Sequence, residues 1–277
     1  MAKAQGIIGN FKGKIGNTVG YQLTSSNNKQ TQGIRIYQPV VKNPKTSAQA
    51  EQRAKLAPIN ATYRALKIVI DRGNEGLPYG NKSRLAWLKQ AFKATNMPWI
   101  EKGSVVGYPV CGPLTKGSLA GVKIETGDDD FFIVCSGVKG ESTLATIGAV
   151  STAMKTAYPS LQDGDQITIV IIGQVAGVLA SDIFSFVIDP TSAVATDKFG
   201  GDADKISVSS NLHIMGGAVI VSREGANGEH LRSNSTLVVY NELLEKAPYD
   251  AASKTATIKS YMTSGDSYTD WEQEPID

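Results

Sequence analysis

Two histidines are the candidates for a general base in this chain of 277 residues. Hydrolysis through an activated serine or cysteine usually depends on such a base. His213 lies between Leu212 and Ile214 in a strand-like pattern, which favours a structural role, and His230 follows the turn-forming segment 225–229. The sequence contains no Gly-x-Ser-x-Gly nucleophile elbow that could pair with either histidine. We therefore expect no catalytic residue and no enzymatic activity.

The glycine-rich start has the composition of a phosphate-binding loop but not its spacing. The motif from Gly9 to Gly13, followed by Lys14, is one residue shorter than a P-loop, and Ile15 stands where Ser or Thr would hold Mg²⁺. The segment 13–16 matches the Gly-x-x-Gly loop of KH domains, but the helices of that domain are not predicted around it. We expect no nucleotide and no other cofactor.

Three acidic clusters and two cysteines are the candidate metal ligands. The clusters at 128–130, 163–165 and 202–204 lie between predicted strands, where Asp and Gly form turns, and none has the spacing of a calcium-binding EF-hand. Cys111 and Cys135 are too few for a zinc site or a disulfide framework, which favours free buried thiols. We expect no metal site.

The charges are distributed unevenly along the chain. Residues 1–102 contain 17 Lys or Arg and four Asp or Glu, whereas residues 103–277 contain 11 and 22, so the two parts carry +13 and −11. The basic part can bind nucleic acid, an acidic protein surface, or the acidic part of a neighbouring copy. Two solvated domains of different charge remain the alternative. The longest apolar run, Ile167–Ile172, is too short to span a membrane, so we expect no membrane contact.

Residues 1–42 are predicted to form a basic, glycine-rich arm. Two strand-like segments, 15–23 and 33–41, are joined by the polar stretch 24–32, which predicts a long hairpin. Five glycines between residues 6 and 20 disfavour a helix, at about 1 kcal/mol each relative to alanine. An arm of this kind is expected to pair its backbone with the sheet edge of a neighbouring molecule.

Two helices are predicted after the arm. Thr46 and Gln49 have the spacing of a capping box, and the apolar periodicity that follows predicts a helix to about residue 71. Pro58 should kink this helix, because proline removes one intrahelical hydrogen bond. A second helix is predicted over residues 83–94.

From residue 103 the apolar residues alternate with a period of two, which indicates strands. With one helical insert at 142–158, this pattern predicts an immunoglobulin-like β-sandwich and an α+β fold for the whole chain. The predicted domains are 1–102, 103–247 and an acidic C-terminal tail, 248–277. The predicted strands are Ser104–Val110, Leu119–Glu125, Phe131–Ser136, Gln166–Ile172, Ile183–Ile188, Ile206–Leu212, Ala218–Arg223 and Ser235–Tyr240.

Three stretches of the chain resemble a known group of proteins. They are GIIGNFKGKIGNTVGYQL, GIRIYQPVVKNPKTSAQAEQRAKLAPINATYRAL and GGAVIVSREGANGEHLRSNSTLVVY. They are similar to a family of uncharacterised Bacteroidetes proteins with a glycine-rich N-terminal arm and an immunoglobulin-like C-terminal domain, and to virion structural proteins of crAss-like gut phages. The resemblance covers about residues 5–95 well and 165–240 loosely. The helical insert and the acidic tail depart from the family pattern.

The resemblance implies a virion structural protein of a tailed phage, a subunit of a head–tail connector or tail ring assembled through its N-terminal arm. It implies a homo-oligomeric ring that contacts the portal and other connector or tail proteins, possible proximity to DNA, and a location in the virion after assembly in the cytoplasm of the bacterial host. A capsid decoration or vertex protein, and a nucleic-acid-binding protein without sequence specificity, remain alternatives. The expected contact residues are Phe11, Lys12, Lys14, Tyr21, Arg35, Tyr37, Arg53, Arg64 and Arg72.

Overall fold

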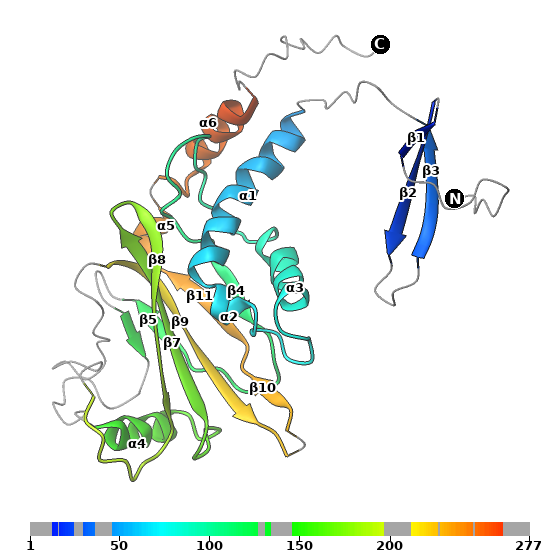
Figure 1. Cartoon of the computed structure of the whole chain (residues 1–277). Coiled ribbons are helices and arrows are strands. Elements are labelled where there is room, and N and C mark those ends of the chain that lie inside the picture. Colours follow the sequence, from blue (N-terminus) through cyan, green and yellow to red (C-terminus); the bar gives the residue numbers. More distant parts are fainter. Residues whose placement is uncertain are drawn as a thin grey trace. The chain divides into compact units, whose positions relative to one another are not determined.

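The computed structural model of the chain divides into two compact units, Met1–Lys45 and Thr46–Asp277 (Figure 1). Each unit is described by itself. The structure describes residues 13–15, 17–24, 30–36, 46–126, 131–133, 146–196, 212–226, 228–245 and 247–262.

The N-terminal unit is a three-stranded antiparallel sheet in the order β1-β2-β3, formed by β1 (Gly13–Ile15), β2 (Thr18–Thr24) and β3 (Gln30–Ile36). β2 and β3 form a hairpin in which Tyr21 lies opposite Gly33. The Tyr21 ring covers Gly33 closely, and a Cβ atom at this position would come within 2.5 Å of the ring. Only glycine therefore leaves room for the ring. Ile34 and Ile36 are 48% and 79% exposed.

The second unit is built on one large antiparallel sheet in the order β4-β11-β9-β7-β8, with β10 paired to β9. Every pair of neighbouring strands is antiparallel, and helices cover the sheet, so the fold is α+β. The strands are β4 (Gly112–Thr115), β7 (Gln166–Val175), β8 (Val178–Val187), β9 (His213–Glu224), β10 (His230–Arg232) and β11 (Ser235–Val239).

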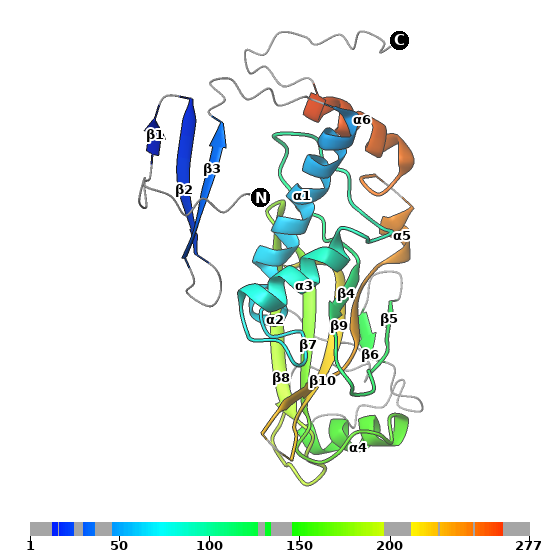
Figure 2. The same ribbon diagram turned by 90° about the vertical axis from the view of Figure 1, so that its right-hand side faces the viewer.

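Both faces of this sheet are covered, and for that reason its central strands are continuously apolar. On one face, Val170 and Ile172 of β7 pack with side chains of α1 (Ser47–Ala65), α2 (Lys67–Ile70) and α3 (Asn81–Ala91). On the other face, Ile167 and Ile169 pack with α4 (Ile147–Ala157). Figure 2 shows α1, α2 and α3 together on one side of the sheet.

The first helix begins as the capping pattern predicts, because the Thr46 hydroxyl accepts a hydrogen bond of 3.3 Å from the backbone N–H of Gln49. Pro58 lies inside α1 and does not end it. The interruption comes at Leu66, whose backbone leaves the helical region at φ −112° and ψ 21°. The single helix predicted to residue 71 is therefore two helices.

Two short segments complete the unit. β5 (Ile124–Thr126) and β6 (Phe131–Ile133) form a small hairpin, and α5 (Asn241–Leu244) follows β11. α6 (Ala251–Met262) packs along α1, within the part of the chain predicted to be a polar tail. Lys254 of α6 explains this packing, because its ammonium lies 3.3 Å from the Glu51 carboxylate and 5.2 Å from the centre of the Trp99 ring.

Two further sequence-based expectations are not confirmed by the structure. Residues 104–110 form no strand; the Gly107 carbonyl instead accepts a hydrogen bond from Gln174 near the β7–β8 turn. The immunoglobulin-like sandwich is not confirmed, since the described residues place α1–α3 on one face of the sheet. The helices of residues 46–102 share a core with the sheet and belong to the same compact unit.

Candidate interaction surface

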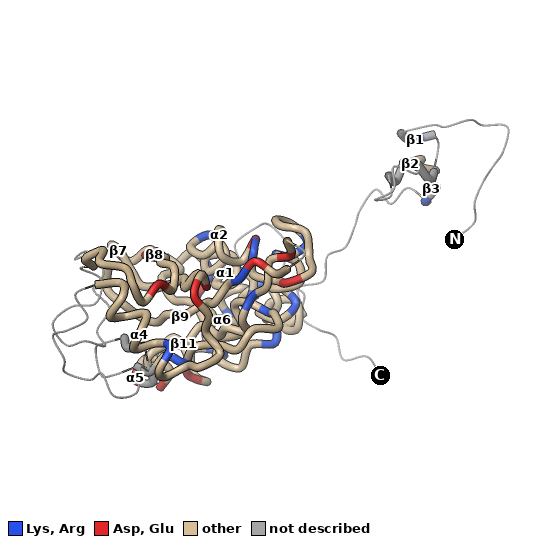
Figure 3. The backbone as a smooth tube through the Cα atoms, turned by 90° about the horizontal axis from the view of Figure 1, so that it is seen from below, with Lys and Arg blue, Asp and Glu red and all other residues tan. Residues whose placement is uncertain are grey.

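The helices on one face of the sheet form a layer, residues 46–102, whose exposed charges are mostly positive. Figure 3 marks the Lys and Arg positions along the backbone in blue and the Asp and Glu positions in red. The layer contains four acidic residues, and Glu51, Asp71 and Glu75 each bind a neighbouring group through the carboxylate. Only Glu101 among the four is fully exposed. The exposed basic residues are Arg53, Arg64, Lys67, Arg72, Lys82, Lys89, Lys93 and Lys102.

Arg53 and Arg64 lie on one face of α1. They are eleven residues apart, which is close to three helical turns and about 16 Å along the axis. In the described part of the chain neither side chain forms an ion pair, and Leu56 on the same stripe is 41% exposed. This face combines guanidinium groups with apolar surface and can bind phosphates or an acidic protein surface.

Arg72 lies apart from this face, beyond the end of α2. Its guanidinium carbon is 5.7 Å from the centre of the Tyr79 ring, and Tyr79 stacks on His230 with ring centres 6.1 Å apart. These side chains line a surface pocket of about 430 Å³ between the segment 72–79 and β10. His230, which follows the turn-forming segment 225–229, is exposed and lies against this aromatic ring.

Glu75 lines this pocket, and its carboxylate joins segments that are far apart in the sequence. Its carboxylate accepts hydrogen bonds from the Ser118 N–H at 2.9 Å, from the Ser118 hydroxyl at 2.9 Å and from the Arg232 N–H at 3.0 Å. Burial alone would raise the pKa of Glu75, but these hydrogen bonds outweigh it and lower the pKa. The ionised carboxylate therefore stabilises the folded state.

Substitution of Glu75 by glutamine is expected to lower the melting temperature at neutral pH. Because the folded-state pKa is below the ordinary value of 4.5, the stabilisation is present above that pH and is lost as the pH falls through the folded-state value. The difference in melting temperature between wild type and E75Q should therefore shrink in acid. Thermal scans of both proteins from pH 3 to pH 7 measure it, with E101Q as the control at an exposed glutamate. A difference that stays constant with pH contradicts the assignment.

The arm residues predicted as contacts are only partly described. Lys14 and Arg35 are exposed on β1 and β3, and Tyr21 is half-buried over Gly33. Phe11, Lys12 and Tyr37 lie outside the described residues. Residues 1–45 contain seven Lys or Arg and no Asp or Glu, so the whole N-terminal unit is a cation.

The groups considered for catalysis or metal binding are separated in the structure. His213 is exposed at the start of β9, and burial raises the pKa of the Cys111 thiol to about 12, which keeps it protonated. Cys135 and the acidic clusters at 128–130 and 202–204 lie outside the described residues. Across the described residues, no group of His, Cys, Asp or Glu is arranged to hold a metal ion. In the same part of the chain, no helix is long and apolar enough to cross a bilayer.

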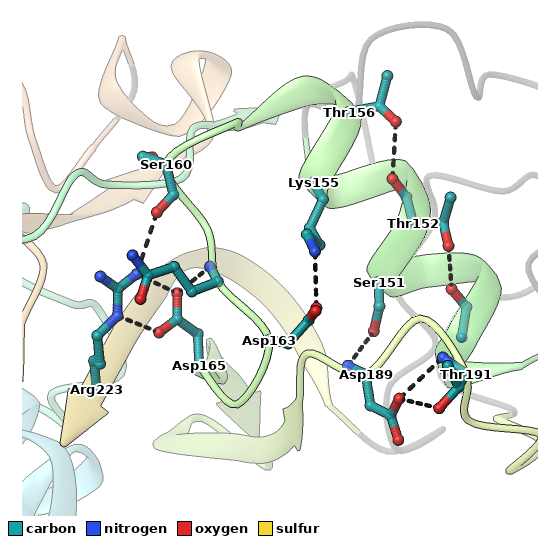
Figure 4. Close-up of polar contacts among 12 residues, drawn as sticks. Ser151, Thr152, Lys155, Thr156, Ser160, Asp163, Asp165, Asp189, Thr191 and Arg223 are labelled. Carbon is teal, nitrogen blue, oxygen red and sulfur yellow. Dashed lines mark hydrogen bonds and ion pairs between the residues drawn. The ribbon is translucent and has the colours of Figure 1, made fainter.

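Asp165, from the acidic cluster at 163–165, forms a buried ion pair that sequence reasoning missed (Figure 4). Arg223 of β9 donates to both carboxylate oxygens, and the Nη2–Oδ2 distance is 2.7 Å. The same carboxylate accepts the backbone N–H of Gln162 at 2.8 Å, and Arg223 also donates to the Ser160 carbonyl. The hydrogen bond to Asp165 raises the pKa of Arg223. These contacts tie the α4–β7 connection to the sheet.

No family model, no curated protein and no solved structure matches the chain.

Proposed function

We propose that this chain is a non-enzymatic structural protein of a tailed-phage virion, a subunit of a head–tail connector or tail ring assembled through its N-terminal arm. The observation that carries the proposal is the division of the chain. A small sheet with seven basic and no acidic residues forms its own compact unit, followed by a larger α+β unit. This division suits a subunit that holds its neighbours by a projecting element.

The resemblance of residues 5–95 to virion proteins of crAss-like phages supports the same proposal. The partners would be further copies of the chain, the portal, and other connector or tail proteins in the virion. The proposal does not need an immunoglobulin-like sandwich, because a sheet covered by helices on both faces also provides a folded base. A capsid decoration or vertex protein would use the same arm and base, and it stays an alternative within this class.

Nucleic-acid binding without sequence specificity is the second candidate. Arg53 and Arg64 favour it, because they are exposed on one face of α1 and form no ion pair within the described part of the chain. Contacts of this kind neutralise phosphates and release counterions, so the affinity would fall steeply with salt.

A purified sample of the chain is expected to form one discrete oligomer whose mass is a multiple of 29.4 kDa. A closed ring stops growing when its last interface forms, so the mass should not increase with protein concentration beyond that point. Native mass spectrometry and sedimentation across a range of concentrations measure this. The same copy number should be found for the chain in purified virions. A 29.4 kDa monomer that is absent from virions and binds DNA supports the second candidate instead.

A further inference from the structure

The two outer strands of the large sheet differ in how they are protected. β4 has only four residues, contains Pro113, and pairs with β11 through an irregular register. Its end is also covered, because Lys116 exchanges backbone hydrogen bonds of 2.9 Å with Gly73 and Glu75. Short length, proline, irregular pairing and a covering segment are the usual means by which proteins prevent pairing at a sheet edge.

β8 has none of these features. Its ten residues pair with β7 in an uninterrupted register from Val178 to Val187, and among the described residues β7 is its only partner strand. The sequence VLASDIFSFV contains no Pro, no Gly and no Lys. Leu179 and Ile183 pack on the side of the helices, and the Ser181 hydroxyl donates to the Ala65 carbonyl at 2.6 Å. β8 is therefore packed against the helices, and its outer edge is ten residues long.

The one charged residue of β8 lies in the middle of this edge strand. Asp182 is half-buried. The residue of β7 that lies directly opposite it is Ile171, which is fully buried and apolar. No hydrogen bond or ion pair joins the Asp182 carboxylate to any residue in the described part of the chain. A carboxylate at this position disfavours pairing with an apolar strand and favours a strand that brings a cation.

β3 of the N-terminal unit has the matching features. It is one of the two outer strands of a three-stranded sheet. Its charged residue is Arg35, which is exposed and lies opposite the apolar residue Val19 of β2. Ile34 and Ile36 on either side of Arg35 are exposed on the opposite face of the strand. No acidic residue occurs anywhere in residues 1–45 to compete for Arg35.

We infer that β3 of one copy pairs with the β8 edge of a second copy, antiparallel, with Arg35 opposite Asp182. This inference rests on the proposed function and names the surface that the arm uses. In this register Ile34 lies beside Ile183 and Ile36 beside Ser181, so both isoleucines extend the apolar layer under the helices. Arg35 then supplies the cation that Asp182 lacks. The contact is heterologous, since one copy gives β3 and the other gives β8, and such contacts generate rings when they close.

Disulfide trapping between full-length chains tests the pairing. Residues directly opposite in antiparallel strands have Cα atoms about 4.5–5.5 Å apart, within the range that a disulfide bridges. An equimolar mixture of R35C and D182C chains in a glutathione buffer is expected to give at least tenfold more covalent dimer than R35C with V178C. Val178 lies on the same face of β8, four residues and about 13 Å away, and both mixtures contain the native cysteines. Equal yields of dimer overturn the inference.

A charge exchange provides a second, non-covalent readout. R35E and D182R are each expected to weaken self-association about tenfold, and the R35E/D182R double variant is expected to restore it. K29E makes the same charge change within residues 1–45, at a position outside β3 and outside the expected contact residues, and is expected to leave association unchanged. If K29E weakens association as much as R35E, the charge of the arm and not this pairing is responsible, and the inference fails.

The outcomes separate this inference from the proposed function. Discrete oligomers without the R35C–D182C cross-link overturn only the assigned edge. A chain that stays monomeric at every concentration and is absent from virions overturns both. R35C and D182C can also be placed in one chain. A cross-link within that chain, together with no dimer from the mixture, shows that the strand pairs with its own chain. That result overturns the assignment to a second copy.

Discussion

Replacement of Arg223 by methionine is expected to lower the free energy of unfolding by about 3–5 kcal/mol. The Asp165 side chain is 1% exposed, so loss of its guanidinium partner leaves a buried carboxylate whose remaining donor among the described residues is the Gln162 N–H. A buried charge without a counterion costs far more than the ion pair contributes when intact. Urea unfolding followed by circular dichroism measures the difference in free energy of unfolding between the wild type and R223M.

Lys155→Met is the matched control for this substitution. Lys155 and Asp163 form the other ion pair in this region at 2.8 Å, but their side chains are 33% and 64% exposed (Figure 4). An exposed pair of this kind contributes about 0–1 kcal/mol. The double variant R223M/D165L should regain most of the stability, because it removes both charges together. A cost below 1 kcal/mol for R223M alone contradicts the role assigned to this pair.

Reversal of three charges, R53E/R64E/R72E, is expected to abolish assembly of the chain or its binding to DNA. The variant changes the net charge of the helical layer by six units, at three arginines that form no ion pair in the described part of the chain. Each exposed contact contributes little, so the loss is collective and is expected to be largest at low salt. Sedimentation and DNA binding are measured on the same preparation.

The two readouts distinguish the two candidate functions. If the arginines contact neighbouring subunits or other virion proteins, association is lost and DNA binding is unaffected. If they contact phosphates, the slope of log affinity against log salt falls by about one for each arginine that binds a phosphate.

K82E/K89E/K93E is the control for this triple variant, because it makes the same charge change in the same layer, at two lysines of α3 and one just after its end. Equal loss in both variants means that the total charge, and not these three arginines, governs binding. No change in either variant means that the positive layer is only a solvated surface.

Some of the structure follows from local patterns in the sequence. The helix beginning after Thr46 was predicted correctly because its cap and apolar periodicity lie within a few residues of one another. The predicted strand at Gln166–Ile172 corresponds to β7, whose continuous apolar run reflects a strand buried on both faces. α6 was missed, because it lies in the part of the chain predicted to be a tail and its packing depends on Glu51 and Trp99, far away in the chain.

The candidate interaction surface was also predictable from the sequence only in part. The excess of basic residues in 1–102 is a property of the sequence, and it predicts an electrostatic partner without further information. The sequence does not tell which charged side chains are bound within the fold and which are left for a partner. That depends on contacts such as those of Glu75 with Ser118 and Arg232, which are 43 and 157 residues away.

The sequence by itself determined the class of the fold, the basic start of the chain and the small sheet-forming segment within it. Only the tertiary structure decided that α1–α3 cover one face of the large sheet and that β8 is its outer strand. The physical reason is that strand order and helix packing depend on contacts between distant residues, whereas hydrophobic periodicity and capping are local. Asp182 is an ordinary acidic residue in the sequence, and the strand order places it on a sheet edge, where it has no ion pair among the described residues.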